Sequence, residues 1–351
     1  MTPLSFWMFV LLSILKVAVV TVILLTSVAY TVLLERKLVG RIQNRWGPSR
    51  VGPFGLMQPL VDGLKLFLKE DMIPTGVYKP LYLLAPLIAL GCSLLSIAVI
   101  PFGEPLTYRG FKWFEISDLN IGLLIILGVT SISVYGIALA GWSSNNKYSL
   151  LGALRSSAQM VSYELALGLS LVGVVLRSGS FNLAEIVKVQ SAHGIASWNI
   201  FGGGQIVAFF IYLTAAYAET NRAPFDLPEA ETELTGGYHT EYSSMKFAMF
   251  FMAEYANMIT VGCVATLLFL GGWTSPFGNL FPEPHSVILL SIISILWFVG
   301  KVFAFLFLYI WVRGTLPRFR YDQLMGYGWK YLVPVAMLNI VGTSLVMAVF
   351  P

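Results

Sequence analysis

Charged residues are scarce in this sequence of 351 residues. Lysine, arginine, aspartate and glutamate make up 11% of it, whereas hydrophobic residues make up 57%. A soluble domain carries about 25% charged residues. The composition therefore excludes a chain of soluble domains and predicts a protein that lies mostly in a membrane. The first apolar stretch, 6–34, is too long for a signal peptide and no small-residue cleavage site follows it, so we expect it to be retained as a span.

Cysteine and histidine are nearly absent. Cys92 and Cys263 each lie alone in an apolar stretch, and His193, His239 and His285 lie in three different loops. Such a set cannot hold an iron–sulfur cluster or ligate a haem between two histidines. We therefore expect no redox centre or covalently bound cofactor in this chain, and any such group to belong to a partner protein.

Long apolar stretches organise the rest of the chain. About 20 apolar residues cross the roughly 30 Å hydrocarbon core of a bilayer. On that basis the sequence predicts eight spans, of which the fifth is short: 6–34, 80–101, 121–142, 158–177, 205–219, 244–271, 286–312 and 330–350. No soluble domain, internal repeat or low-complexity run interrupts them. The expected fold is all-α, a single transmembrane helical bundle over 1–351.

The distribution of basic residues predicts the orientation. With the N-terminus outside, the odd-numbered loops face the cytoplasm or matrix and hold 16 of the 22 lysines and arginines. The other side holds four: Arg109, Lys112, Arg177 and Lys188. Because positive residues are enriched on the cytoplasmic side of membrane proteins, this excess favours an external N-terminus.

The first cytoplasmic loop, 35–79, contains an amphipathic stretch. Within 54–70 five apolar residues recur at helical spacing, with an acid and two lysines on the opposite side. The apolar set is Met57, Leu60, Val61, Leu64 and Leu68, and the polar set is Asp62, Lys65 and Lys69. Too short to span, this helix is expected to lie along the membrane interface. The alternative is an ordinary surface helix over the bundle, which Pro59 could shorten.

Four ionisable residues fall inside predicted spans: Lys16, Glu164, Glu254 and Lys301. Charged groups at this depth are costly and often functional. One interpretation pairs Glu164 or Glu254 with Lys16 or Lys301 as structural ion pairs. The interpretation we favour is a proton path through the two carboxyls, with Tyr163 able to donate a hydrogen bond beside Glu164.

The cytoplasmic loop 219–243 is strongly acidic. Six acids stand against a single arginine, Arg222, in a loop where basic residues are expected. The acids are Glu219, Asp226, Glu229, Glu231, Glu233 and Glu241. Three of them alternate, so an extended backbone places their carboxylates on one face, where neighbouring groups share protons. A fully solvated loop is the alternative, but the interleaved Phe225, Leu227 and Leu234 favour a partly buried cluster.

A second polar region follows the first span. It joins 35–37, with one acid and two basic residues, to the segment 44–53, which combines Arg45 and Arg50 with Trp46 and two Gly-Pro turns. Such a region at a membrane surface could order anionic lipid, dock a soluble partner or line the mouth of a pocket for an amphiphile. The residue chemistry leaves these three open.

Four stretches resemble a known family. They are LERKLVGRIQNRWGPSRVGPFGLMQPLVDGLKLFLKE (34–70), NNKYSLLGALRSSAQMVSYELALGLS (145–170), AETNRAPFDLPEAETELTGGYHTEYSSMKFAMFFMAEYANM (218–258) and WVRGTLPRFRYDQLMGYGWK (311–330). Together they are similar to the membrane subunit at the quinone end of proton-pumping NADH:quinone oxidoreductase, respiratory complex I. They cover about a third of the chain, and the third stretch is the most specific.

The resemblance implies a function and a set of site residues. The implied quinone-binding residues are Glu35, Arg36, Arg45, Asp62, Phe251, Met252 and Arg313. The implied proton path comprises Tyr163, Glu164, Glu219, Asp226, Glu229, Glu231, Glu233, Glu241 and Glu254. No residue is expected to be catalytic in its own right, and none to bind metal.

The resemblance also implies the surroundings of the chain. The substrate would be a quinone, ubiquinone or menaquinone, and the iron–sulfur clusters and FMN would lie in partner subunits. Hydrophilic quinone-site and iron–sulfur subunits would dock on the cytoplasmic or matrix side, beside small and antiporter-like membrane subunits. The membrane would be the bacterial plasma membrane or the mitochondrial inner membrane, and nucleic acid would have no part. The loops 102–120 and 178–204 match no motif of the family.

Two rival functions fit part of the pattern. The related membrane subunit of an energy-converting hydrogenase would share the fold without using quinone, although the PEAETELTGGYHTEY continuation is more similar to the quinone branch. A stand-alone proton-coupled transporter would also carry acids in its spans, but it should show an internal repeat and broken helices. Neither is evident in this sequence.

Overall fold

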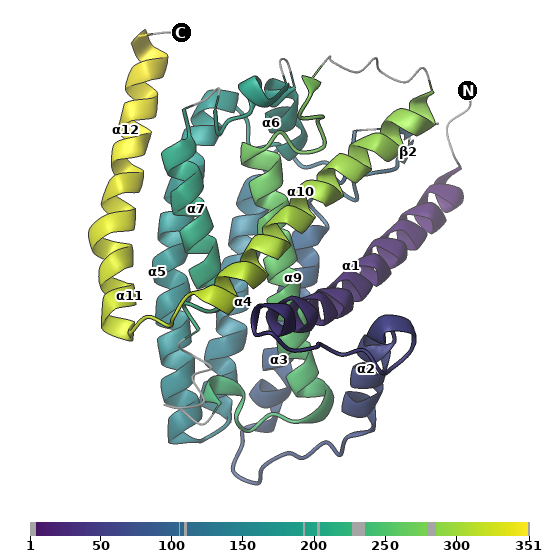
Figure 1. The fold of residues 1–351 in the computed structure, drawn as a ribbon, viewed down its shortest axis with the longest axis vertical. Helices are drawn as coiled ribbons and strands as arrows, with labels where there is room; N and C mark the ends of the chain where they lie inside the picture. Colours follow the sequence, from purple (N-terminus) through teal and green to yellow (C-terminus); the bar gives the residue numbers. More distant parts are fainter. Residues whose placement is uncertain are drawn as a thin grey trace.

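The computed structural model describes residues 5–104, 106–108, 111–191, 194–201, 204–226, 236–278 and 286–349, of which 287 and 288 by backbone alone (Figure 1). The helices are α1 (Phe6–Ile42), α2 (Gln58–Leu68), α3 (Lys79–Ile97), α4 (Gly122–Ser143), α5 (Lys147–Ser178), α6 (Leu183–Gln190), α7 (Ile206–Glu219), α9 (Ser244–Phe269), α10 (Val287–Thr315), α11 (Tyr321–Tyr327) and α12 (Val333–Val349). Between α3 and α4, strands β1 (Thr107–Tyr108) and β2 (Phe111–Lys112) pair antiparallel. The predicted all-α polytopic membrane fold is confirmed.

Each of the eight predicted spans corresponds to a helix. Within the described residues, seven helices are long and apolar enough to cross a bilayer, and α7 is the shorter eighth. Its 14 residues extend about 21 Å, less than the hydrocarbon core. The two chain ends lie at the same end of the bundle (Figure 1), as an even number of crossings requires.

Several helix ends differ from the predicted spans. Helix α5 begins at Lys147, well before the predicted 158, because the Asn146 side chain caps it by accepting a hydrogen bond from the backbone N–H of Tyr148. Helix α1 continues to Ile42, past the predicted end at 34. At the C-terminal side, α11 runs through a π-helical turn into α12. Hydropathy locates apolar length, whereas these ends are set by capping and by polar extensions outside the bilayer.

The core of the bundle consists of α3, α4, α5, α7 and α9, which pack along one another. Glycine permits the closest crossing, because a Cβ on Gly141 of α4 would lie 2.5 Å from the Ser149 carbonyl oxygen of α5. Helices α1 and α10 run at a slant across these upright helices, and α12 stands at the opposite edge (Figure 1). Both slanted helices end near the loop that follows α1.

The two buried lysines bind backbone carbonyls. The Nζ of Lys16 donates to the carbonyl oxygens of Lys112 and Glu115 at 2.9 and 2.8 Å. The Nζ of Lys301 donates to three carbonyl oxygens in the segment after α9, at 2.7–2.9 Å. The alternative in which these lysines pair with Glu164 or Glu254 is therefore wrong. Lys16 fastens α1 to the strand pair, and Lys301 fastens α10 to the end of α9.

Helix α2 lies outside the core. It covers Gln58–Leu68, shorter than the predicted 54–70, because Pro59 occupies its first turn and residues 53–55 form a separate 3₁₀ turn. None of its residues is buried, and Leu60 and Phe67 are 68% and 70% exposed. The apolar face is thus not packed on this chain, as would be the case for an ordinary surface helix. Its placement in the membrane interface stays a prediction.

Candidate functional site

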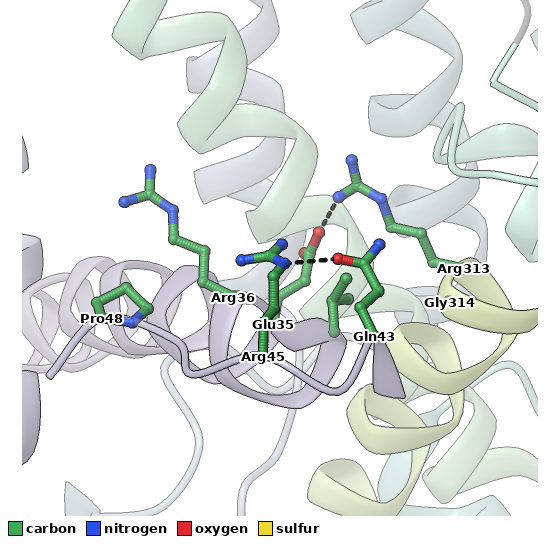
Figure 2. Close-up of a pocket in the computed structure, with 8 residues that line it drawn as sticks. Glu35, Arg36, Gln43, Arg45, Pro48, Arg313 and Gly314 are labelled. Atoms are coloured by element: carbon green, nitrogen blue, oxygen red, sulfur yellow. Dashed lines mark hydrogen bonds and ion pairs between the residues drawn. The ribbon is translucent and has the colours of Figure 1, made fainter. Parts of the chain in front are cut away.

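A polar cavity lies where α1, α10 and the loop after α1 meet. Its volume is about 560 Å³. It is lined by Glu35, Arg36, Val39, Gln43, Arg45, Pro48, Arg313 and Gly314. Figure 2 shows the arginines 36, 45 and 313 arranged around Glu35. Four of the predicted quinone-binding residues therefore share one cavity, although they come from segments far apart in the sequence.

Glu35 lies at the inner wall of this cavity. It is only 8% exposed, and its Oε1 accepts a hydrogen bond from Nη1 of Arg313, marked in Figure 2. Its Oε2 accepts a hydrogen bond from the Tyr255 hydroxyl at 2.8 Å and lies 3.7 Å from Nη1 of Arg222. A buried carboxylate requires such partners, because an unpaired charge away from water is costly.

The outer wall of the cavity is connected to α2. Nη1 of Arg36 lies 2.6 Å from Oδ2 of Asp62, whose Oδ1 also accepts from Nε2 of Gln58 at 2.8 Å. Lys37 donates to the carbonyl oxygen of Phe54. Asp62 does not line the cavity itself. It holds α2 beside the cavity through Arg36, so α2 borders the opening.

Arg222 connects the cavity to the interior of the bundle. Its Nε lies 2.9 Å from Oε1 of Glu254 on α9, while its Nη1 approaches Glu35. The guanidinium group also stacks over the Tyr255 ring, 4.0 Å from the ring centroid. Arg222 is 6% exposed, so these contacts lie in a low-dielectric environment where charge–charge interactions are strong. One arginine thus bridges the cavity carboxylate and an intramembrane carboxylate.

The predicted site did not include Arg222 and Tyr255. Arg222 had a signal, since it is the single basic residue of the acidic loop. Tyr255 directly follows Glu254 and had no separate signal. Which carboxylates they join depends on the packing of α1 against α9 and on the turn after α7, and helical periodicity does not provide that information.

The other two predicted quinone residues lie on α9 behind the cavity. Phe251 and Met252 are partly buried against the main hydrophobic core. The Phe251 ring packs against the Tyr255 ring at a centroid distance of 4.8 Å. Neither residue lines the cavity. Phe251 supports the ring that holds Glu35 and Arg222.

Tyr163 and Glu164 of the predicted proton path lie on different faces of α5. The carboxylate of Glu164 accepts a hydrogen bond from the Ser131 hydroxyl of α4. The Tyr163 hydroxyl instead donates to the carbonyl oxygen of Leu324 at 2.8 Å. Successive helical residues point about 100° apart, which explains why the expected Tyr163 hydrogen bond goes to α11.

The acids of the 219–243 loop are divided between two places. Glu219 ends α7, and Asp226 is 6% exposed and pairs with Arg318 at 3.0 Å. Glu241 accepts a hydrogen bond from the Asn146 side chain at 2.7 Å and lines a second cavity of about 380 Å³ with residues of 74–76 and 144–148. The alternating acids Glu229, Glu231 and Glu233 lie outside the described residues.

The described residues contain no cluster of three or more histidine, cysteine or acidic side chains suited to a metal ion. The chemistry of the site rests on carboxylates, guanidinium groups and a phenol. Guanidinium groups donate hydrogen bonds to carbonyl oxygens and carboxylates, and a buried carboxyl accepts or releases a proton. The arrangement suits binding of a polar, hydrogen-bond-accepting head group and transfer of a charge change to Glu254.

The fold and the site define a multi-spanning membrane protein with a polar cavity joined to buried carboxylates. A family model described as NADH dehydrogenase matches residues 15–344, and the chain belongs to this family. Its relatives within the family are the H-type subunits of NADH-quinone oxidoreductase. The chain is 64% identical to one of these subunits from Koribacter versatilis, over 98% of this chain and 99% of the relative.

More distant relatives carry the same description. An H-type subunit of the NADH-quinone oxidoreductase of Solibacter usitatus is 50% identical over 97% of this chain and 98% of its own. The corresponding subunit of Leptospira biflexa is 49% identical over 97% and 96%. The similarity therefore covers the whole bundle rather than one motif.

Proposed function

We propose that the chain is the membrane subunit of respiratory complex I that forms the quinone-binding chamber and the first part of the proton-translocation path. The observation that carries the proposal is the bridge made by Arg222, which lies 2.9 Å from Glu254 and 3.7 Å from Glu35. A charge change in the cavity thereby reaches a carboxyl group inside the bundle without a gap.

The cavity is the proposed site of the quinone head group. Three arginines surround one carboxylate there, so donors for the two carbonyl oxygens of a quinone outnumber acceptors. The proposed quinone-binding residues are Glu35, Arg36, Arg45, Asp62, Phe251, Met252 and Arg313. The exposed apolar side chains of α2, at the edge of the cavity, provide a surface along which an apolar quinone tail enters from lipid.

Reduction of a quinone to a quinol takes two electrons and two protons. The electrons come from an iron–sulfur cluster in a partner subunit, which receives them through FMN in another partner. The negative charge that appears at the quinone attracts Arg313 and Arg222 away from Glu35 and Glu254. The carboxyl groups respond by taking up protons.

From the cavity the proton path leads into the membrane. The proposed path comprises Tyr163, Glu164, Glu219, Asp226, Glu229, Glu231, Glu233, Glu241 and Glu254. Of these, Glu254 contacts Arg222 directly, and Glu164 is held between α4 and α5 by Ser131. The path continues towards small and antiporter-like membrane subunits.

The proposed setting is the bacterial plasma membrane, with the N-terminus outside. Hydrophilic quinone-site and iron–sulfur subunits dock on the cytoplasmic end, where the cavity lies. The bacterial relatives and the excess of basic residues in the loops at this end support this orientation. A subunit of an energy-converting hydrogenase is the alternative, and the names of the relatives favour the quinone branch.

Replacement of Glu254 or Glu219 by glutamine tests the proposal. Either change removes a titratable proton while keeping the side-chain shape. We expect quinone reduction coupled to proton pumping to fall at least about tenfold, while NADH oxidation by ferricyanide, which needs only the peripheral subunits, stays unchanged. Both activities are measured in membrane vesicles that contain the assembled enzyme.

The matched control is Glu185→Gln, because Glu185 is exposed at the opposite end of the bundle and its carboxylate bonds only the neighbouring Ser180 among the described residues. It should retain both activities. Normal coupled turnover in both Glu254→Gln and Glu219→Gln would exclude the proposed path. Insensitivity of the enzyme to a quinone-site blocker would favour the hydrogenase alternative.

A further inference from the structure

A single buried amide holds the turn that carries Arg222. Gln159 of α5 is 0% exposed. Its Nε2 donates to the carbonyl oxygen of Ala218 at 2.8 Å and to that of Phe225 at 2.9 Å. These two carbonyls lie before and after Arg222, so both donor hydrogens of one side chain hold the two ends of the same turn.

The two carbonyls depend on this amide. Ala218 lies in the last turn of α7, where carbonyl oxygens lack a partner further along the helix. The backbone N–H groups that approach it come from the turn itself, such as that of Asn221 at a long 3.4 Å. Because the site is buried, a carbonyl that loses its donor there is costly. The conformation of the turn is therefore coupled to the presence of Gln159.

Neighbouring contacts fix the same turn more weakly. One turn earlier on α5, the Ser156 hydroxyl accepts a hydrogen bond of 3.2 Å from Asn221, whose backbone φ is 49°. On the far side, the N–H of Phe319 donates to the carbonyl oxygen of Pro224 at 3.1 Å. Residues three apart on a helix share a face. Gln159 and Ser156 thus form one polar strip that receives the turn.

We propose that Gln159 is a positioning residue for coupling: it fixes the turn 218–225 so that the Arg222 guanidinium reaches Glu35 and Glu254 at once. The inference rests on the proposed function of the Arg222 bridge and adds the residue that places it. Gln159 itself contacts neither carboxylate. Its influence on turnover passes through the position of Arg222.

The test is Gln159→Met in the assembled enzyme, which keeps the length of the side chain and removes both donors. We expect kcat for reduction of a short-chain quinone to fall on the order of tenfold, because ångström-scale displacement of a reacting constellation has effects of this size. The KM for the quinone and the ferricyanide activity should change less than about twofold.

Gln190 supplies a matched control. It is a buried glutamine of α6, 1% exposed, whose Nε2 donates to the carbonyl oxygen of Leu267 at 2.9 Å. It lies at the other end of the bundle, away from Arg222. Gln190→Met should lower the thermal stability as much as Gln159→Met does, yet leave kcat within about twofold of the unmodified enzyme.

A double-variant comparison separates positioning from general loss of structure. If Gln159 acts through Arg222, Gln159→Met should lower kcat little further once Arg222→Met is present. Equal fold-losses in both backgrounds would overturn the inference, as would equal kcat for Gln159→Met and Gln190→Met. Should Gln159→Met fail to assemble, Ser156→Ala loosens the same turn and should lower kcat about threefold; unchanged kcat in that variant would likewise overturn it.

These outcomes are distinct from failure of the proposed function. Arg222→Met and Glu254→Gln with full coupled turnover would remove the bridge from the mechanism altogether. Loss of turnover in those two variants, with normal turnover in Gln159→Met, would retain the bridge and reject only its positioning by Gln159.

Discussion

Glu35 has a partner on each of three sides. Arg313 and Arg222 offer it positive charge, and the Tyr255 hydroxyl donates to it at 2.8 Å. Opposite charges of this kind strengthen one another in a dry environment. The residue therefore sets the electrostatic balance of the cavity: its carboxylate determines how strongly the two guanidinium groups are held away from a bound molecule.

Glu35→Gln tests this balance. The amide still accepts from Tyr255 but no longer neutralises the two arginines, so the arrangement that receives the quinone is lost. We expect the KM for a short-chain quinone to rise about tenfold, which corresponds to about 1.4 kcal/mol. Steady-state kinetics with assembled enzyme measure it, with Glu185→Gln as the control. A KM that stays the same would show that the cavity carboxylate has no part in quinone binding.

At the scale of elements, the outer end of the molecule is held by a small ionic cluster. Lys112 of β2 pairs with Glu115 at 2.8 Å and with Asp118, which also accepts from the Asn182 side chain at 3.0 Å. The Lys112 ammonium and the Asn182 amide hold the pKa of Asp118 below its usual value. The hydrogen bonds to Asp118 and Glu115 raise the pKa of Lys112. The cluster joins the strand pair to α6.

The pH dependence of this cluster follows from the two directions. Asp118 contributes stability above its unfolded pKa of about 4, and this is lost as the pH falls through the lower folded value. Lys112 contributes below its unfolded pKa of about 10.4, and this is lost as the pH rises through the higher folded value. Because both side chains are partly exposed, the pair contributes under about 1 kcal/mol.

Asp118→Asn should therefore flatten the acid limb. Hydrogen exchange of residues 111–118 in the assembled enzyme, measured between about pH 3 and 7, should accelerate on acidification in the unmodified protein but already be fast in the variant. Identical profiles would mean that other contacts, such as Lys16 with the carbonyls of this segment, hold it without the ion pair.

The elements themselves were largely predictable, because apolar length is written directly in the sequence. All eight spans correspond to helices, yet their ends were not predicted well. Asn146 caps α5 well before the apolar stretch begins, and hydropathy is insensitive to such a cap. The short helix α2 was found from its periodicity, and Pro59 accounts for its late start.

At the scale of the whole molecule, the site depends on convergence that no single segment predicts. Glu35 ends up beside Tyr255, 220 positions away along the chain, and Arg313 comes from a third helix. The resemblance to a known family supplied four of the cavity residues. Arg222, Tyr255 and Gln159 emerged only from the packing, since their roles lie in which groups they join rather than in their residue types.

The slanted helices link the cavity to the bilayer. Helix α1 has 37 residues and α10 has 29, so they extend about 55 and 44 Å against a hydrocarbon core of roughly 30 Å, which an inclined helix accommodates. Little of the apolar stretch of α1 is buried within this chain. Its inclination therefore depends on the surrounding lipid as well as on protein contacts.

Hydrophobic mismatch then becomes a control on the chemistry. A thicker bilayer draws long helices upright and a thinner one tilts them, and the ends of α1 and α10 carry Glu35 and Arg313. In proteoliposomes of increasing acyl-chain length, the quinone KM of the assembled enzyme should change while its ferricyanide activity does not. A KM independent of thickness would show that the subunits around α1 fix its tilt. With dependence, the lipid itself is part of the geometry in which Glu35 meets Arg313.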